Sequence, residues 1–375
     1  MTTDVGISDT AIKIGMPFGL GGALGPFFKD LEKPAIAVLR EANDAGGING
    51  RKFQWILEDT RWDVNTGSAA VKKLVEQDKV AFLVGWEHYT CNTVAAYVDQ
   101  VKVPMFGCEG SADDQYHHAF MFPSTCSSFR TWSHVAGKYI TENMGKKIYV
   151  ITHNTPGNTA GLNEFKYAVQ QGGGKVIGEA QVPFDHSDYT PQVLDMRQKN
   201  PDAIYSWIHP DQTVKLYLAM QRQGYKPKIL NSTESLPQGV WRGIGDAAKG
   251  ALMLACNSFV KNATGFVQTT TRYYPQTSAT LFSWSMFGFG GAKALVEGLR
   301  RAGRNMTRPA VMAAVANGQP IDVGGTVPGG GMVYRPGNPP PNHLGTWLYS
   351  WDGNDYVDIS KGWIMDPYPD RTTNF

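Results

Sequence analysis

Aromatic and carboxylate side chains recur in short polar segments that follow predicted strands. Trp62 comes after a strand predicted at 52–59, and Trp86 and Glu87 come after one predicted at 80–85. Indole rings stack on aromatic solutes or hold a cation over the ring face, and carboxylates accept hydrogen bonds from donor-rich groups. These residue types therefore predict non-covalent capture of a small molecule.

The motifs of covalent and cofactor chemistry are missing from the sequence. No G-x-S-x-G, H-E-x-x-H or complete Walker loop occurs, and the polar run 113–118 has no metal-ligand spacing. Gly19, Gly21 and Gly25 form G-x-G-x-x-x-G, a near miss of the dinucleotide fingerprint. We expect no enzyme, cofactor or metal, and a nicotinamide-dependent oxidoreductase is the alternative from another class. A ligand-sensing regulator is less favoured because no output domain follows.

Length and charge restrict the partner. The chain has 375 residues, more than one core of roughly 250–300 residues accommodates, so two lobes with a cleft are expected. A net charge of +2 gives no reason to expect nucleic acid or an anionic membrane. No apolar run approaches the ~18 residues of a membrane span. The polar start MTTDVGISDTAIKIG resembles a chain from which a secretory leader has been removed.

The apolar pattern alternates between strand and helix. A strand at 11–18 leads through a glycine-rich loop to a helix from Phe27 to Ala42, and Gly46-Gly47 should cap it before an Asn49-Gly50 turn. Repetition of this unit predicts a parallel, doubly wound sheet, because each helical crossover returns the chain to the same edge. A second such series begins near Phe129. Two strands, at 346–353 and 355–363, should close the chain around an Asp-Gly turn.

Two of the four cysteines are predicted neighbours. Cys108 and Cys126 each follow a short strand-like run. They are either bridged in an oxidising compartment or are two buried free thiols.

Several ordered phrases resemble the solute-binding proteins of ABC importers, of the leucine/isoleucine/valine-binding type. The resemblance covers most of the chain, and AGGINGRK at 45–52 is the most specific phrase. The others are ISDTAIKIGMPFG, INGRKFQWILED, AVKKLVEQDKVAFLVG, KVPMFG, YVITHN, GLNEF and RQGYKPKIL.

The resemblance implies an α/β protein with two doubly wound parallel-sheet lobes joined by a three-crossing hinge, the type I periplasmic binding fold. The first lobe would take residues 1–126 and about 258–334, and the second about 127–257 and 335–375. It also implies a periplasmic monomer that closes on a solute and delivers it to a membrane permease.

Ligands of open α/β sheets bind beyond the carboxyl ends of the strands, which selects the loops to inspect. In the resembled family, small hydroxyl residues and backbone N–H groups of the second and third loops hold a ligand carboxylate. Here Ser111 is retained in the third loop, but Trp86, Glu87, His88 and Tyr89 replace the small residues of the second. This departure from the family pattern argues against a plain aliphatic amino acid as the bound solute. Glu234 matches the family position whose carboxylate receives a ligand amine.

Other candidates have competing roles. His209 either donates to ligand or caps a helix, and Asn158 corresponds to a family position that is often aromatic. Glu87 and Glu109 either make the cleft acidic or pair with Arg61 or Arg130. The expected ligand-binding residues are Phe18, Trp62, Trp86, Glu87, His88, Tyr89, Thr90, Glu109, Gly110, Ser111, Asn158, Trp207, His209, Glu234 and Trp284.

An acidic, aromatic cleft favours a cation or a donor-rich neutral solute over an inorganic anion. The solute classes that remain are an amino-acid derivative, an amide or urea-like compound, a quaternary amine and a small aromatic acid.

Overall fold

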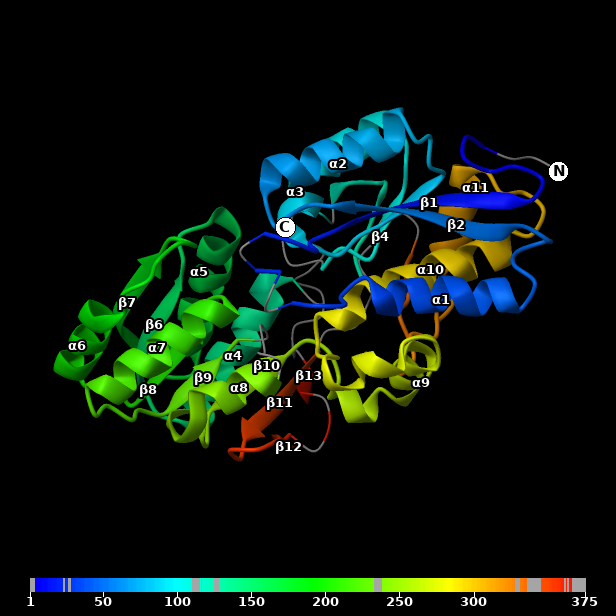
Figure 1. Ribbon diagram of the computed structural model, residues 1–375. Helices are drawn as coiled ribbons and strands as arrows, with labels where there is room; N and C mark the ends of the chain where they lie inside the picture. Colours follow the sequence, from blue (N-terminus) through cyan, green and yellow to red (C-terminus); the bar gives the residue numbers. More distant parts are fainter. Residues whose placement is uncertain are drawn as a thin grey trace. The chain divides into compact units, whose positions relative to one another are not determined.

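The chain divides into two compact units, whose elements are labelled in Figure 1. This computed structural model describes residues 4–22, 24–25, 28–109, 115, 117–124, 128–232, 238–327, 331–335, 345–360, 362 and 364–365. Among the described residues, those within 4–124 and 257–335 belong to the first unit, and those within 128–256 and 345–365 belong to the second. Each unit is therefore built from separate stretches of the chain.

The first unit contains a five-stranded parallel sheet in the order β2-β1-β3-β4-β5. All residues of β1 except Lys13 are buried, as expected for a strand covered on both faces. The strands are β1 (Ala11–Phe18), β2 (Lys52–Asp59), β3 (Phe82–Val84), β4 (Met105–Phe106) and β5 (Met121–Phe122).

Helices cover both faces of this sheet, with α1 and α10 on one side and α2 and α3 on the other (Figure 1). α10 is the predicted apolar helix, and most of its residues are buried. The helices are α1 (Lys33–Asp44), α2 (Val64–Glu76), α3 (His88–Val101), α9 (Thr264–Tyr273), α10 (Ser285–Ala302) and α11 (Arg308–Val315), with 3-10 turns η3 (Val260–Asn262) and η4 (Pro275–Ala279).

The predicted stop of the first helix is confirmed. Gly46 and Gly47 have φ of +101° and +76°, and the Gly47 N–H donates to the Ala42 carbonyl at 2.8 Å. The predicted start was too early, because α1 begins at Lys33. Asp30, with φ of +68°, interrupts the helical path, and Pro34 occupies the first turn, where its missing N–H is not needed.

The second unit contains an eight-stranded sheet with a parallel core in the order β7-β6-β8-β9-β10. β11 pairs antiparallel with β10, and β12 and β13 pair antiparallel with β11, so the sheet is mixed at this edge. The strands are β6 (Lys147–His153), β7 (Lys175–Val182), β8 (Ala203–Trp207), β9 (Ile229–Asn231), β10 (Leu252–Ala255), β11 (Gly345–Trp351), β12 (Tyr356–Asp358) and β13 (Ile364–Met365).

The predicted closing hairpin is confirmed by β11 and β12. The Asp352 carboxylate accepts hydrogen bonds from the backbone N–H groups of Asn354 and Asp355, which forms the turn. Gly353 takes φ of +108° there. A tight turn of this kind makes the two strands that it joins antiparallel, as β11 and β12 are.

The helices of the second unit begin at recognisable caps. Ser128 accepts from the Thr131 N–H at α4, and Thr155 accepts from the Asn158 N–H at α5. The helices are α4 (Phe129–Asn143), α5 (Pro156–Gln171), α6 (Thr190–Lys199), α7 (Pro210–Arg222) and α8 (Gln238–Ile244), with the 3-10 turn η2 (Gly245–Ala248). None of the helices within the described residues has the length and apolarity that a membrane crossing requires.

Both alternatives given for Cys108, a bridge to Cys126 and a buried free thiol, are wrong. Cys108 forms a disulfide with Cys91, and their Cα atoms are 6.0 Å apart. Cys91 lies in α3, the helix that follows β3, and Cys108 lies two residues after the end of β4. Because β3 and β4 are parallel neighbours, their carboxyl ends bring these residues to one edge. Cys256 is also disulfide-bonded, and Cys126 lies outside the described residues.

Candidate functional site

Three loops that are distant in sequence meet at the carboxyl edge of the first sheet. A Cβ atom built on Gly19 would lie 2.2 Å from Glu87 Oε1 and 2.6 Å from Trp62 Nε1. Only a glycine leaves room for these two side chains to approach the backbone after β1. Among the predicted residues, the structure therefore brings Trp62 and Glu87 together.

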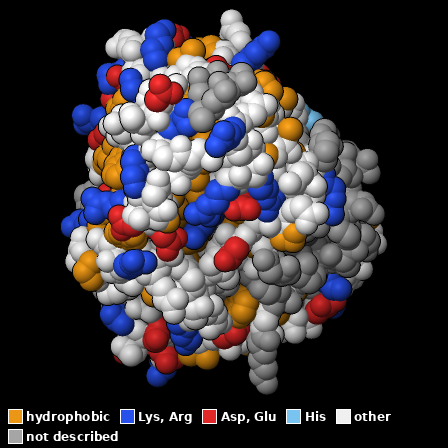
Figure 2. All heavy atoms as spheres, turned by 90° about the vertical axis from the view of Figure 1, so that its right-hand side faces the viewer, with side chains coloured by type: hydrophobic (Ala, Val, Ile, Leu, Met, Phe, Trp, Pro, Cys, Tyr) orange, Lys and Arg blue, Asp and Glu red, His pale blue; other side chains and the backbone are white. Residues whose placement is uncertain are grey.

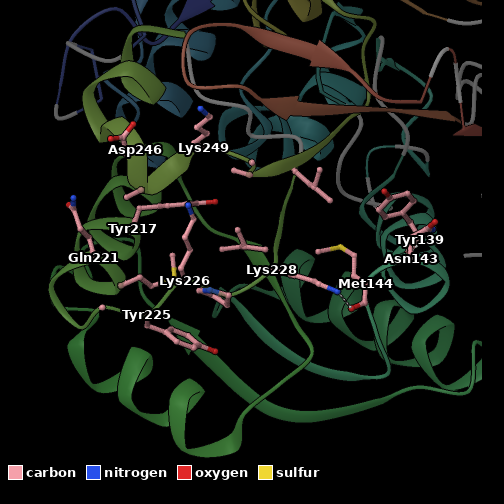
Figure 3. A pocket seen from close by; sticks show the side chains of 18 residues that line it. Tyr139, Asn143, Met144, Tyr217, Gln221, Tyr225, Lys226, Lys228, Asp246 and Lys249 are labelled. Atoms are coloured by element: carbon pink, nitrogen blue, oxygen red, sulfur yellow. Dashed lines mark hydrogen bonds between the residues drawn. The ribbon is translucent and has the colours of Figure 1, made fainter.

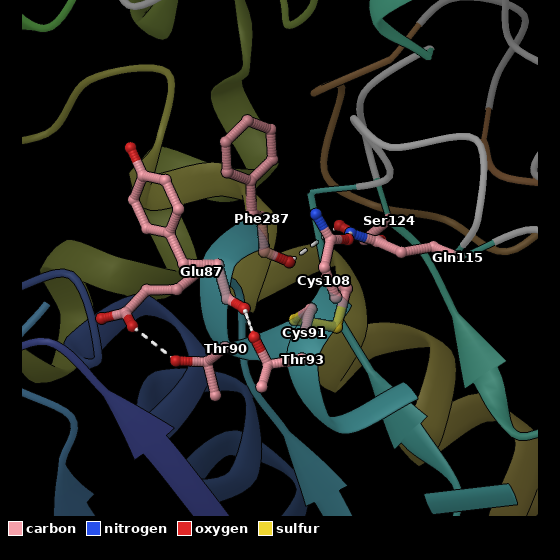
Figure 4. Close-up of a disulfide and its surroundings, with 10 residues drawn as sticks. Glu87, Thr90, Cys91, Thr93, Cys108, Gln115, Ser124 and Phe287 are labelled. Carbon is pink, nitrogen blue, oxygen red and sulfur yellow. Dashed lines mark hydrogen bonds between the residues drawn. A yellow bond between two sulfur atoms is a disulfide. The ribbon is translucent and has the colours of Figure 1, made fainter. Parts of the chain in front are cut away.

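The Glu87 carboxylate is buried and held in a defined position. The Thr60 hydroxyl lies 2.6 and 2.8 Å from its two oxygens, and the Thr90 hydroxyl donates to Oε2 at 2.9 Å (Figure 4). Thr60 follows β2, whereas Thr90 lies in the first turn of α3. The predicted residue Thr90 thus positions the carboxylate, and Thr60 is a functional candidate that sequence reasoning missed.

Six rings of the first unit form an aromatic cluster, made of Phe28, Trp62, Trp86, Phe282, Trp284 and Phe287. The ring centroids of Trp86 lie 5.1 Å from Trp62 and 5.2 Å from Trp284. Trp62 is half-buried, and the other five rings are buried. The predicted residues Trp62, Trp86 and Trp284 therefore converge, with Trp62 as the most accessible member.

The backbone that presents Trp62 adopts an unusual conformation. Arg61 and Trp62 have φ of +55° and +60°, a region that bulky residues rarely enter. The Asp59 carboxylate supports this path by accepting backbone N–H groups of Leu20, Gly21 and Arg61. Burial raises the pKa of Asp59, but these hydrogen bonds outweigh that effect and the net shift is downward. Strained backbone of this kind clusters at binding sites.

The second and third loops of this edge are joined to each other. The Glu109 N–H donates to the Trp86 carbonyl at 3.2 Å, and the Cys91–Cys108 disulfide links the same segments (Figure 4). The Glu109 side chain is buried. Gly110 and Ser111 lie outside the described residues.

Other predicted residues of the first unit have different places. Phe18 is fully buried and packs under α10, where a Cβ built on Gly288 would lie 2.9 Å from its Cζ atom. This position makes Phe18 a core residue of the unit. Tyr89 is half-buried, and its carbonyl accepts from the Thr93 hydroxyl. The His88 side chain is outside the described part of the structure.

In the second unit, Trp207 and Asn158 serve internal roles. The Trp207 ring lies 4.7 Å from Phe129 and 5.7 Å from Trp132, and it is buried. The Asn158 side chain donates to the Thr152 hydroxyl at 3.0 Å and accepts from the Thr155 hydroxyl at 2.6 Å. These contacts pack the core and fix the start of α5.

His209 lies at the carboxyl edge of the second sheet beside a histidine that sequence reasoning missed. The His209 N–H donates to His153 Nε2 at 3.0 Å, and His153 Nδ1 lies 3.3 Å from the Val182 carbonyl. These partners assign the His153 proton to Nδ1. Phe184, which is 41% exposed, stacks on His209 at 4.8 Å. The His209 side chain makes no capping hydrogen bond to α7.

Glu234 lies outside the described residues, so its predicted role stays a prediction. Within the described part of the chain, no group of three or more His, Cys, Asp or Glu side chains is arranged to hold a metal ion. On the face shown in Figure 2, lysines and arginines are interspersed with aspartates and glutamates, and neither sign forms a continuous patch.

A family model described as periplasmic binding protein matches residues 11–354, which is most of the chain. The chain belongs to the periplasmic binding protein family. Among curated relatives, the "Leu/Ile/Val-binding protein homolog 1" of Brucella abortus is 26% identical over 250 residues. That match covers 65% of this chain and 66% of the relative, just under two thirds of its length.

Solved structures show that this periplasmic binding protein has the type I fold. A branched-chain amino acid ABC transporter protein from Thermus thermophilus with bound valine has a TM-score of 0.84 at 15% identity, covering 98% of this chain and 100% of that one. A solute-binding protein from Rhodopseudomonas palustris in complex with 3,4-dihydroxybenzoic acid has a TM-score of 0.79 at 18% identity, covering 95% and 99%. Solutes of different chemistry are therefore bound on this fold.

The glycine loop after β1 of this periplasmic binding protein does not have a dinucleotide-binding arrangement. The N–H groups of Leu20 and Gly21, which a diphosphate would require, donate to the Asp59 carboxylate. Glu87 lies against Gly19 and adds negative charge at the same place. A pyrophosphate would be repelled here, so the geometry argues against the nicotinamide alternative.

Proposed function

We propose that this periplasmic binding protein captures a small organic solute and delivers it to the permease of an ABC importer. The observation that carries the proposal is the convergence of the aromatic cluster with the Glu87 carboxylate at the strand ends of the first unit. The two units act as the two lobes, and hinge closure brings groups of the second lobe onto the solute. A ligand drives closure only through contacts that it gains in the closed state.

The favoured solute carries an amine or amide group on an apolar or aromatic body. Glu87 is an acceptor-only group when ionised, and the surrounding rings offer flat faces for stacking or for cation–π contact. Amino-acid derivatives, amides and amine-bearing compounds meet both requirements. The valine-bound neighbour and the Leu/Ile/Val-binding relative make an amino-acid-like solute the first choice to test.

A small aromatic acid is the second candidate, and one specific observation favours it. The indole N–H groups of Trp62, Trp86 and Trp284 have no acceptor among the described residues. A ligand carboxylate would supply one, and the dihydroxybenzoate complex shows an aromatic acid bound on this fold. Other buried indoles of the second unit, Trp132 and Trp241, share this property, so the observation ranks the acid second.

The first prediction concerns Trp62, the accessible ring of the cluster. A thermal-shift screen with phenylalaninamide, phenylalanine, choline and benzoate should find a class that raises the melting temperature, because ligands bound to the folded state stabilise it. Trp62→Ala should then weaken that ligand at least about tenfold by calorimetry, a loss of about 1.4 kcal/mol. Removing one stacking face accounts for a loss of this size.

Tyr97→Ala is the matched control, since Tyr97 is also half-buried in the first unit and hydrogen-bonds Glu76 on its surface. It should leave affinity unchanged. Equal affinity of Trp62→Ala and the parent protein would count against the proposed site. Turnover of the bound solute by the purified protein would instead support an enzyme.

A further inference from the structure

A cavity of the second unit lies at the edge of its sheet opposite to the expected ligand edge. It has a volume of about 710 Å³, and all of its lining residues belong to the second unit and are described (Figure 3). Lys228 and Leu252 mark the amino ends of β9 and β10, and the ends of α4 and α7 form its walls. Ligand cavities commonly have volumes of 300–1,000 Å³.

The charged lining has a surplus of positive side chains. Lys226, Lys228 and Lys249 line the cavity together with a single carboxylate, that of Asp246. Within the described residues, no carboxylate lies within ion-pair distance of the ammonium group of Lys226 or Lys249. Both lysines are exposed, and Lys249 also acts on the Asp352 carboxylate, whose pKa is lowered by backbone hydrogen bonds and by the charge of this lysine.

These two lysines are not needed at the neighbouring helix ends. The carbonyls at a helix C-terminus attract cations. After both α4 and α7, another basic side chain already donates to such a carbonyl. Lys228 donates to the Met144 carbonyl after α4 at 3.4 Å, as Figure 3 shows, and Arg197 donates to the Gln223 carbonyl after α7 at 2.7 Å. Lys226 and Lys249 consequently have no such role.

A neutral hydrogen-bond donor, the Tyr217 hydroxyl, also belongs to the lining of the cavity. Tyr217 is 2% exposed, and its oxygen accepts a hydrogen bond from the Asn231 amide at 3.0 Å. Its own hydroxyl hydrogen has no acceptor among the described residues, and leaving a buried donor without an acceptor is destabilising. An acceptor-bearing ligand would remove that cost.

The remaining lining is suited to an apolar body. Met144, Met220 and Ile229 contribute apolar surface, and thioethers adapt to flat rings. We propose that this cavity is a second binding site, separate from the solute site of the proposed function, for an organic anion with a flat apolar body. The carboxylate or another anionic group of that ligand meets Lys226 and Lys249, and the body lies against the methionines.

The test uses methyl-labelled methionine in the full chain and follows Met144 and Met220 by NMR, each assigned by substitution with leucine. The probe is 2-naphthoate, compared with 2-naphthalenemethanol and 2-naphthylmethylammonium. Naphthoate should shift both methyl signals saturably and bind at least about fivefold more tightly than the alcohol. The Lys226→Gln/Lys249→Gln variant should weaken naphthoate at least about fivefold and leave the alcohol unchanged.

Lys175→Gln is the control, because Lys175 is an exposed lysine of the same unit outside this cavity. It should bind naphthoate like the parent protein. Trp62→Ala should also retain the signal, which separates this site from the solute site. Unshifted Met144 and Met220 signals, a shift confined to Met286 of the first unit, or equal binding of alcohol or ammonium would each overturn the proposal.

Discussion

At the scale of single residues, Asp59 organises the strand-end site of the first unit. Its carboxylate fixes the loop after β1 through Leu20 and Gly21 and supports the left-handed backbone at Arg61. The same contacts fix the two loops that place Trp62 beside Gly19. Geometry at this site therefore depends on a residue that need not touch the solute.

The lowered pKa of Asp59 leads to a prediction for stability against pH. A carboxyl whose pKa is lower in the folded state than in the unfolded state stabilises the fold fully above its unfolded pKa of about 3.9. That contribution is lost as pH falls through the lower folded value. Asp59→Asn should therefore be less stable than the parent protein at pH 7, and the difference should shrink below about pH 4.

Urea unfolding at pH 7 and pH 3 measures this difference. Asp185→Asn is the control, because Asp185 is exposed and its side chain makes no hydrogen bond or ion pair among the described residues. If the difference in free energy of unfolding between the parent protein and Asp59→Asn is the same at both pH values, the stabilising role of the Asp59 carboxylate is contradicted.

At the scale of elements, the Cys91–Cys108 disulfide joins α3 to the segment after β4. It thereby holds the Trp86–Glu87 loop and the Glu109 loop as one piece. A disulfide stabilises mainly by restricting the unfolded chain, by about 3 kcal/mol for a loop of roughly 15 residues. Such a bond also fits the oxidising environment of a periplasmic family.

Cys91→Ser/Cys108→Ser should lower the free energy of unfolding by about 2–4 kcal/mol. Solute affinity should fall as well, because two loops of the site become independent. Denaturant unfolding and calorimetry measure the two effects, and parent protein treated with dithiothreitol, which also reduces the Cys256 disulfide, should lose at least as much stability as the variant. Unchanged solute affinity in the variant would show that the bond serves stability alone.

At the scale of the whole molecule, the described stretches alternate between the two units three times, between 124 and 128, between 256 and 257, and between 335 and 345. Under the proposed function these passages form the hinge, and a solute held by groups from both units favours the closed form. Small-angle scattering should show a smaller radius of gyration at saturating solute than without it. Naphthoate in the cavity of the second unit should leave the radius unchanged, and identical curves with and without solute would argue against closure.

The sequence by itself determined the elements and the fold class. Apolar periodicity predicted the alternating strands and helices, and Gly46, Gly47 and the Asn49-Gly50 turn marked the end of α1, because local backbone preferences act within a few residues. The same locality placed Trp62, Trp86 and Glu87 at strand ends.

Only the tertiary structure decided which of those residues meet. It paired Cys108 with Cys91, placed Phe18 in the core, and added Thr60 and His153 as partners of Glu87 and His209. Neighbours across a parallel sheet are set by crossover connections of a dozen or more residues, so no local pattern reports them. The cavity beside Lys226 and Lys249 likewise exists only where separate helix ends and strand starts come together.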